Sequence, residues 1–502
     1  MKLIKILLTT GLLVSVSLAS TDAKPKQTLQ ANYMVNYKIK PSSVDSLSDV
    51  FSEGMLYGRL RSHWFFYDWE DQDATHEDHN ILGLGGSLVY KTASYSGFSA
   101  TAGLYYTSAG TNLDDQPSNE GLLKSGKDVV SRYNAMNGKG QSFAVLAQSY
   151  LQYEYKKSKV RFGREIFNSF FTKSNDSKMI PNTFEGVTIE TKAIEKTRLR
   201  AAYLTRQKLR DHDNFHSVIM YDDRSVNQTG DIKPAWDNND DSAIHKGLNY
   251  TNFMLHGQDE NPGLFVVDGF TRAIFDKKLK ISASGVYLPD LFGTAMAELE
   301  YKFELGAGYT LSPGFRYVQQ FDDGAGSIGG AALNGKAARD INGGNALYRN
   351  TYTNPDSVDT HMIAGRLNLN KGAGTLSFGY TKIADEADFI TPWRGFVTGG
   401  YTRAMARYNW VSNTETFRLR GAYNFSKAGI VKGLKTYFSV THEDYDEKKN
   451  PNKDANIYYF GLIHDVQSVA NLSFRFRSEY VEQMAAEANN HAEIRLELNY
   501  LF

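Results

Sequence analysis

The feature that most constrains this chain is a strict alternation of apolar and polar residues that runs to its last residue. In residues 491–502, one set of alternate positions is apolar: Ile494, Leu496, Leu498, Tyr500 and Phe502. The positions between them are polar: Glu493, Arg495, Glu497 and Asn499. Side chains two residues apart point to the same face of a strand. The pattern therefore predicts a final strand with one apolar face and one charged face.

The same alternation recurs throughout residues 54–502 and predicts eighteen strands. They lie near residues 54–69, 80–92, 98–108, 142–155, 159–167, 184–192, 197–206, 264–275, 279–288, 294–303, 308–320, 360–370, 374–383, 415–426, 433–443, 456–466, 470–481 and 491–502. Short connections such as 156–158 alternate with mostly longer ones such as 109–141, 207–263, 321–359 and 384–414. Outer-membrane barrels have this arrangement, with short turns on one rim and long loops on the other. We predict an all-β fold: a transmembrane antiparallel β-barrel of about 18 strands with infolded extracellular loops.

Composition supports this prediction and excludes several other classes. The chain of 502 residues has 31 Tyr, 29 Phe and 43 Gly but no Cys, so disulfides, thiolate zinc sites and cysteine nucleophiles are excluded. Lys+Arg and Asp+Glu number 56 each, which gives no signature of nucleic-acid binding. The mean hydropathy of −0.44 is too polar for a helical membrane protein. The alternative is a secreted β-sandwich or solenoid, but we find no repeat of the length that a solenoid needs.

The amino end has the form of a secretory signal. Lys2 and Lys5 precede an apolar run at 6–16, and small residues follow up to Ala19. We predict a cleaved signal peptide at 1–19, a short periplasmic segment at 20–53 and the barrel domain at 54–502. These segments imply export to the outer membrane of a Gram-negative cell.

Arginines on the polar faces of several strands predict a basic ladder along the pore. Its members are Arg59, Arg61, Arg418, Arg420, Arg475, Arg477 and Arg495. The same rule turns Arg316 and Arg366 inward. A charge that faces lipid at the bilayer midplane costs roughly 2–4 kcal/mol, so this many arginines imply a wet lumen. Successive guanidinium groups would give an anion a series of binding sites. The alternative is that they pair, within the wall, with the inward acids Glu479, Glu493 and Glu497.

A constriction requires opposing charge from a loop that folds inward. The candidates are Asp176 in the 168–183 loop, and Asp322 and Asp323 in the 321–359 loop. Their alternative role is that of solvated loop acids. Residues 400–410 also alternate, but a strand there would place long loops on both rims. We assign them to a long loop that turns into the lumen.

Several segments, in the same order along the chain, resemble the OprD-type outer-membrane porins, a family of substrate-specific channels. The similar segments are Gly58–Arg61, Lys178–Gly186, Gln319–Ala325, Arg420–Phe425, Asn471–Arg477 and Arg495–Tyr500. The resemblance spans about residues 45–502. It departs at Ala422 and Asn424, where acidic residues are expected in the family. This departure weakens any transfer of substrate preference.

The resemblance implies a passive diffusion channel for small hydrophilic solutes, which include carboxylates, amino acids and ions. It implies no catalysis and no cofactor. The expected partners are outer-membrane lipid, lipopolysaccharide and the solutes, with no nucleic acid; a homotrimer and a monomer both remain open. Two other classes are a structural or adhesive surface protein and a barrel hydrolase, for which no serine–histidine or acid dyad stands out.

No metal site is predicted. The first loop, residues 70–79, has acidic and histidine side chains that could collect calcium, but a solvated surface loop is the simpler interpretation. His212 and His216 have a spacing that suits zinc only in a helix, and a third ligand is missing from the sequence nearby.

Overall fold

A computed structural model describes most of the chain. The described residues are 25–30, 33–73, 76, 78–112, 129–131, 134, 140–219, 245, 247–248, 250–259, 261–333, 335, 352–405, 407–449, 453–485 and 489–502. The predicted signal peptide at 1–19 lies outside them, so its cleavage remains a prediction.

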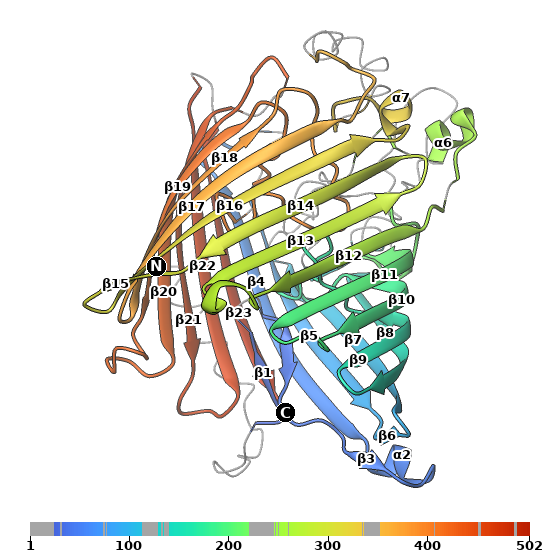
Figure 1. Cartoon of the computed structure of the whole chain (residues 1–502). Helices are drawn as coiled ribbons and strands as arrows, with labels where there is room; N and C mark the ends of the chain where they lie inside the picture. The colour runs from blue at the N-terminus through green and yellow to red at the C-terminus, as the bar shows by residue number, and fades with distance from the viewer. Residues whose placement is uncertain are drawn as a thin grey trace.

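Eighteen long strands in the described part of the chain form a closed antiparallel barrel (Figure 1). They are β4 (Met55–Trp69), β5 (His79–Lys91), β7 (Phe98–Asn112), β8 (Ser142–Tyr155), β9 (Ser158–Glu165), β10 (Thr183–Thr191), β11 (Thr197–Lys208), β12 (Leu264–Thr271), β13 (Leu279–Leu288), β14 (Phe292–Tyr301), β16 (Tyr309–Asp322), β17 (Thr360–Lys371), β18 (Gly374–Ile383), β19 (Glu415–Asn424), β20 (Leu434–Asp444), β21 (Ala455–Asp465), β22 (Leu472–Gln483) and β23 (His491–Leu501). The last strand, β23, pairs with the first long strand, β4, and closes the barrel. The predicted fold class is confirmed.

The remaining elements are short. They are β1 (Gln27–Leu29), β2 (Val35–Tyr37), β3 (Ser43–Val44), α2 (Asp49–Ser52), β6 (Ser94–Tyr95), α6 (Tyr250–His256), η3 (Phe275–Lys277), β15 (Phe303–Gly306) and α7 (Ala325–Gly329). Strands β1 and β2 pair with each other, β3 pairs in parallel with β6, and β15 pairs with β16. Among the described residues, no helix combines the length and the hydropathy that crossing a membrane requires.

Alternation along each strand separates two chemical environments. On β9, Val160 and Phe162 point outward and are exposed, whereas Lys159 and Arg161, which alternate with them, point inward. On β4, Leu56 and Leu60 are exposed, but Arg59 and Arg61 are almost fully buried. The outer face is therefore an apolar band, and the inner face is polar, which is the pattern of a barrel that spans a membrane.

The two rims differ in the length of their connections. The β8–β9 and β17–β18 pairs are joined by tight turns at one rim, which we call the short-turn end. Longer connections, such as residues 384–414 between β18 and β19, leave from the opposite rim, the long-loop end (Figure 1). Of residues 400–410, those that the structure describes (400–405 and 407–410) form no strand and are mostly buried or half-buried, in agreement with their assignment to a loop that turns inward.

Candidate pore and its constriction

The connection between β9 and β10, residues 166–182, folds into the barrel. Asp176 within it is 3% exposed, and its carboxylate forms ion pairs with Arg59 at 3.0 Å and with Arg61 at 3.2 Å. Arg61 also donates hydrogen bonds to the backbone oxygens of Asp176 (2.8 Å) and Met179 (3.2 Å). Because Arg59 and Arg61 lie on the inner face of β4, these contacts hold the connection across the lumen.

A second infolded connection, residues 384–414, packs against the first. Thr172 and Arg394 form an isolated antiparallel bridge, and the amide of Lys173 donates to the oxygen of Trp393 at 2.9 Å. At Gly395 an added Cβ would lie 2.2 Å from the backbone oxygen of Phe171, so only glycine permits this approach. The two connections therefore form one body within the barrel.

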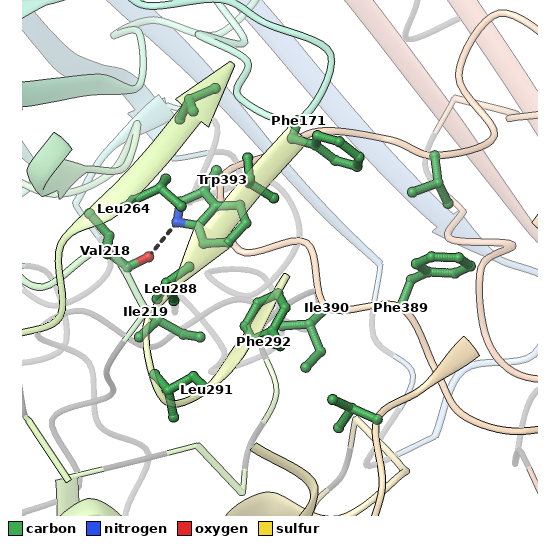
Figure 2. Close-up of a cluster of buried hydrophobic side chains, with 14 of the residues drawn as sticks. Phe171, Val218, Ile219, Leu264, Leu288, Leu291, Phe292, Phe389, Ile390 and Trp393 are labelled. Carbon is green, nitrogen blue, oxygen red and sulfur yellow. Dashed lines mark hydrogen bonds between the residues drawn. The ribbon is translucent and has the colours of Figure 1, made fainter. Parts of the chain in front are cut away.

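Apolar side chains fix this body against one side of the wall. Figure 2 shows Trp393 surrounded by Leu264, Leu288 and Phe292, which project from β12–β14. The indole nitrogen of Trp393 donates to the oxygen of Val218 at 2.7 Å, so the segment after β11 joins the same cluster. Burial of apolar surface stabilises the infolded state, and open space remains along β16–β22.

Two of the inward arginines, Arg316 and Arg366, hold the 384–414 connection. Arg316 pairs with Glu298 at 2.5 Å and donates to the oxygens of Val397 and Gly399 at 2.9 and 2.7 Å. Arg366 pairs with Glu300 at 2.5 Å and donates to the oxygen of Gly400 at 2.8 Å. The ring of Tyr401 contacts both guanidinium groups, with centroid distances of 4.3 Å to Arg316 and 4.8 Å to Arg366.

Next to these contacts lies a cavity of about 650 Å³ with a strongly basic lining. Its charged and aromatic lining residues are Glu300, Arg366, Phe378, Tyr401, Arg403, Arg418, Arg420, Tyr437, Tyr459, Arg475 and Arg477. Six of these are arginines and one is a glutamate, which is already paired with Arg366. The cavity therefore favours negative charge.

The seven predicted ladder arginines fall into two groups. Arg59 and Arg61 are paired with Asp176, Arg477 contacts Glu497, and Arg495 contacts Glu493.

The second group, Arg418, Arg420 and Arg475, has weaker contacts with acidic side chains. Arg418 donates to the oxygen of Arg403 at 2.9 Å and to Ser439 at 3.2 Å. Arg420 lies over the ring of Tyr437, and the ion pair of Arg475 with Glu497 is long, at 3.9 Å. Some of the inward arginines therefore form ion pairs, as the wall-pairing alternative predicts, and the others have weaker contacts, as a basic ladder requires.

Asp322 and Asp323 are not brought next to Asp176. Asp322 accepts hydrogen bonds from the amides of Gly324 and Gly326, both at 3.0 Å, and so stabilises the start of α7. Asp323 accepts from the hydroxyl of Tyr287 at 2.8 Å and from the amide of Asp290 at 3.2 Å. These contacts place both carboxylates at the long-loop rim, where they shape the loop.

Sequence reasoning missed several basic residues of the lumen, among them Arg198, Arg200 and Arg403. Arg198 and Arg200 on β11 point inward toward Asp268, and Arg200 pairs with it at 2.5 Å. Because Arg198 and Arg200 alternate with the outward Leu199, strand periodicity alone could have predicted that they face the lumen. Arg403 comes from the infolded connection and stacks on Phe396 at 3.3 Å. Strand periodicity carries no information about such a loop residue.

The described part of the chain has no group of three His, Cys, Asp or Glu side chains that could hold a metal ion. In the first loop, His76 pairs with Asp73 at 3.0 Å, and Glu77 lies outside the described residues. A nitrogen of His212 lies 2.8 Å from one of His216, so the two histidines interact with each other.

Comparison with known proteins identifies the architecture. The family model for outer membrane porins of the OprD family matches residues 106–502. The chain belongs to the OprD family of outer membrane porins. The porin is therefore an outer-membrane channel for small solutes.

Solved structures have the same fold at low sequence identity. Pseudomonas aeruginosa OpdK with vanillate matches with a TM-score of 0.62 and 13% identity, over 90% of this chain and 99% of that chain. OccK9 (OpdG) of the same organism gives 0.62 and 15%, over 90% and 99%. OpdO gives 0.61 and 16%, over 91% and 98%. Among curated protein sequences, no relative matches this chain.

Proposed function

We propose that solutes cross the porin along the arginine-lined wall and that the channel favours small anions, carboxylates in particular. The observation that carries this proposal is the cavity lining, where six arginines face a single glutamate among the described residues. Asp176 and the infolded connections narrow the path, because they fill part of the lumen.

The spacing of the arginines suits transfer between sites. Arg418 and Arg420 lie two residues apart on β19, and Arg475 and Arg477 have the same spacing on β22. A hydrogen bond to a charged group contributes roughly 1.5–3 kcal/mol, which would trap an anion at an isolated site. Several similar sites in succession allow it to move on.

The cavity also suits a solute that contains a flat aromatic ring. Tyr437 and Tyr459 stack with their centroids 5.6 Å apart, and the guanidinium of Arg420 lies 5.4 Å from the ring of Tyr437. OpdK, which has the same fold, is described with vanillate, an aromatic carboxylate. Benzoate and short aliphatic carboxylates are therefore suitable test solutes for this porin.

Reversal potentials across a planar bilayer with a salt gradient test the proposal. Replacing Arg418 and Arg420 together by Gln should shift the reversal potential toward cations and weaken block by carboxylates. The shift should be larger at low salt, because salt screens charges in a wet lumen. Arg164→Gln is the matched control, since Arg164 pairs with Glu185 outside the cavity lining. An unchanged reversal potential in a folded double variant would contradict the proposal.

The apolar outer face is proposed to contact outer-membrane lipid and lipopolysaccharide. A homotrimer remains a prediction, for which the molecular mass of the detergent-solubilised protein is the test. We also propose that residues 1–19 are removed on export, that residues 20–53 belong to the periplasmic end of the barrel, and that the chain has no catalytic activity.

A further inference from the structure

The segment before the barrel is inserted into the short-turn end. Strands β1 and β2 form a hairpin that pairs Gln27 with Tyr37, and the described residues 25–30 and 33–38 are called the amino-terminal hairpin below. The side-chain amide of Gln27 donates to the oxygens of Gly58 (2.6 Å) and Phe502 (3.2 Å). The hairpin therefore contacts the start of β4 and the end of the chain, where the barrel closes.

One side of the hairpin reaches the arginine-lined wall. Tyr33 is 1% exposed, and the guanidinium of Arg475 lies 4.5 Å from the centroid of its ring. Arg475 lines the cavity, and its ion pair with Glu497 is long, at 3.9 Å. Part of the surface of this guanidinium is thus covered by an aromatic ring from the same chain.

The other side of the hairpin is held by inward residues of β4 and β5. The rings of Tyr37 and Tyr57 meet edge to face at 4.6 Å, and the ammonium of Lys91 lies 4.5 Å from the ring of Tyr37. The hydroxyl of Tyr57 donates to the oxygen of Ile39 at 2.7 Å. Because Tyr57, Lys91 and Arg475 all belong to the inner face, the hairpin lies within the lumen.

We propose that the amino-terminal hairpin is a plug at the short-turn end and that Tyr33 competes with anionic solutes for Arg475. This inference deepens the proposed function, since it assigns the last arginine of the path an internal competitor. Each strand of the hairpin has only three residues, and such a small two-stranded unit is at best marginally stable on its own. A solute that binds Arg475 can therefore displace it without unfolding the barrel.

Single-channel recording of the full chain tests the plug. Tyr33→Ala should raise the conductance and strengthen block by benzoate by about two- to fivefold, the factor expected when a competing cation–π contact is removed. Tyr33→Phe retains the ring and should match the wild type. Tyr155→Ala is the matched control, because Tyr155 is an exposed tyrosine near a short turn, away from the cavity. Heat-modifiable migration verifies that each variant is folded.

Two further variants keep the inference open to refutation. Tyr33→Leu retains apolar volume without an aromatic face, and it should strengthen benzoate block even if Tyr33→Ala does not assemble. Deletion of residues 25–38 should raise the conductance further. The plug is overturned if folded Tyr33→Leu and the deletion both conduct and bind benzoate as the wild type does. If Arg418 and Arg420 still determine selectivity in that case, the proposed function stands and the hairpin is a structural brace.

Discussion

The carboxylate of Asp176 forms an ion pair with Arg59 at 3.0 Å, although 117 positions separate the two residues in the sequence. Arg59 also donates to the side chain of Asn499 at 2.9 Å, on the strand that closes the barrel. The infolded connection, the first strand and the last strand therefore meet at one polar cluster. The position of the proposed constriction therefore depends on the closure of the barrel.

Asp176→Asn should release the infolded connection. The change leaves Arg59 and Arg61 buried with much weaker partners, and removing one partner of a buried ion pair costs about 3–5 kcal/mol. The barrel itself has its own hydrogen-bonded strands, so we expect the loss to appear locally, as a larger and noisier single-channel conductance. Asp323→Asn is the control, because that carboxylate is bound at the rim. A wild-type conductance in Asp176→Asn would show that the connection is held by other contacts.

Tyr401 should be required for the second infolded connection. Its ring contacts both Arg316 and Arg366, and each cation–π contact contributes about 0.5–1 kcal/mol or more where water is excluded. Tyr401→Ala removes both contacts and should raise the conductance and its fluctuations. Tyr401→Phe retains the ring and should conduct like the wild type. Equal currents in all three proteins would refute this role.

Strand periodicity was sufficient to predict the barrel because each strand faces two chemically different environments. The predicted bounds 142–155, 279–288 and 374–383 coincide with β8, β13 and β18. The short β15 was not predicted, since it only extends the wall beside β16.

The paths of the loops could not be predicted in this way. They depend on contacts between residues far apart in sequence, such as Arg316 with the oxygens of Val397 and Gly399. For the same reason, sequence reasoning did not distinguish Asp176, which meets two inward arginines, from Asp322, which binds amides within its own loop. Arg403 was not predicted, because residues 400–410 were assigned to a loop, where alternation does not determine which side chains face the lumen.

Gly58→Ala should impair barrel assembly. A Cβ at Gly58 would lie 2.0 Å from the ring of Phe502, whose amide and oxygen both bond to Gly58. The terminal aromatic ring must then move, and forced overpacking costs about 1–3 kcal/mol. The fraction of heat-modifiable, membrane-inserted protein should fall, as it should on deletion of Phe502. Gly365→Ala is the matched control, because an added Cβ there meets no atom within 4 Å. Equal assembly of the two variants would contradict the prediction.

Lys173 should make the channel sensitive to mildly alkaline pH. Burial lowers the pKa of Lys173 to about 8, and the charges of Arg200, Arg316 and Arg198 act in the same direction, whereas Asp268 opposes them. Because the folded pKa lies below the usual 10.5, the native state loses this proton first as the pH rises. Stability should increase from about pH 8 to about 10.5, because a costly buried charge disappears.

The same titration should be visible in the current. Between pH 7 and 9 the 168–183 loop loses a positive charge, so the reversal potential in a salt gradient should shift toward cations. Lys173→Met should abolish this shift and give the alkaline value at both pH values. Lys192→Met, in the exposed turn between β10 and β11, is the control and should retain the shift. If Lys173→Met titrates like the wild type, the charge that controls selectivity in this pH range belongs to another group, and Lys173 does not face the ion path.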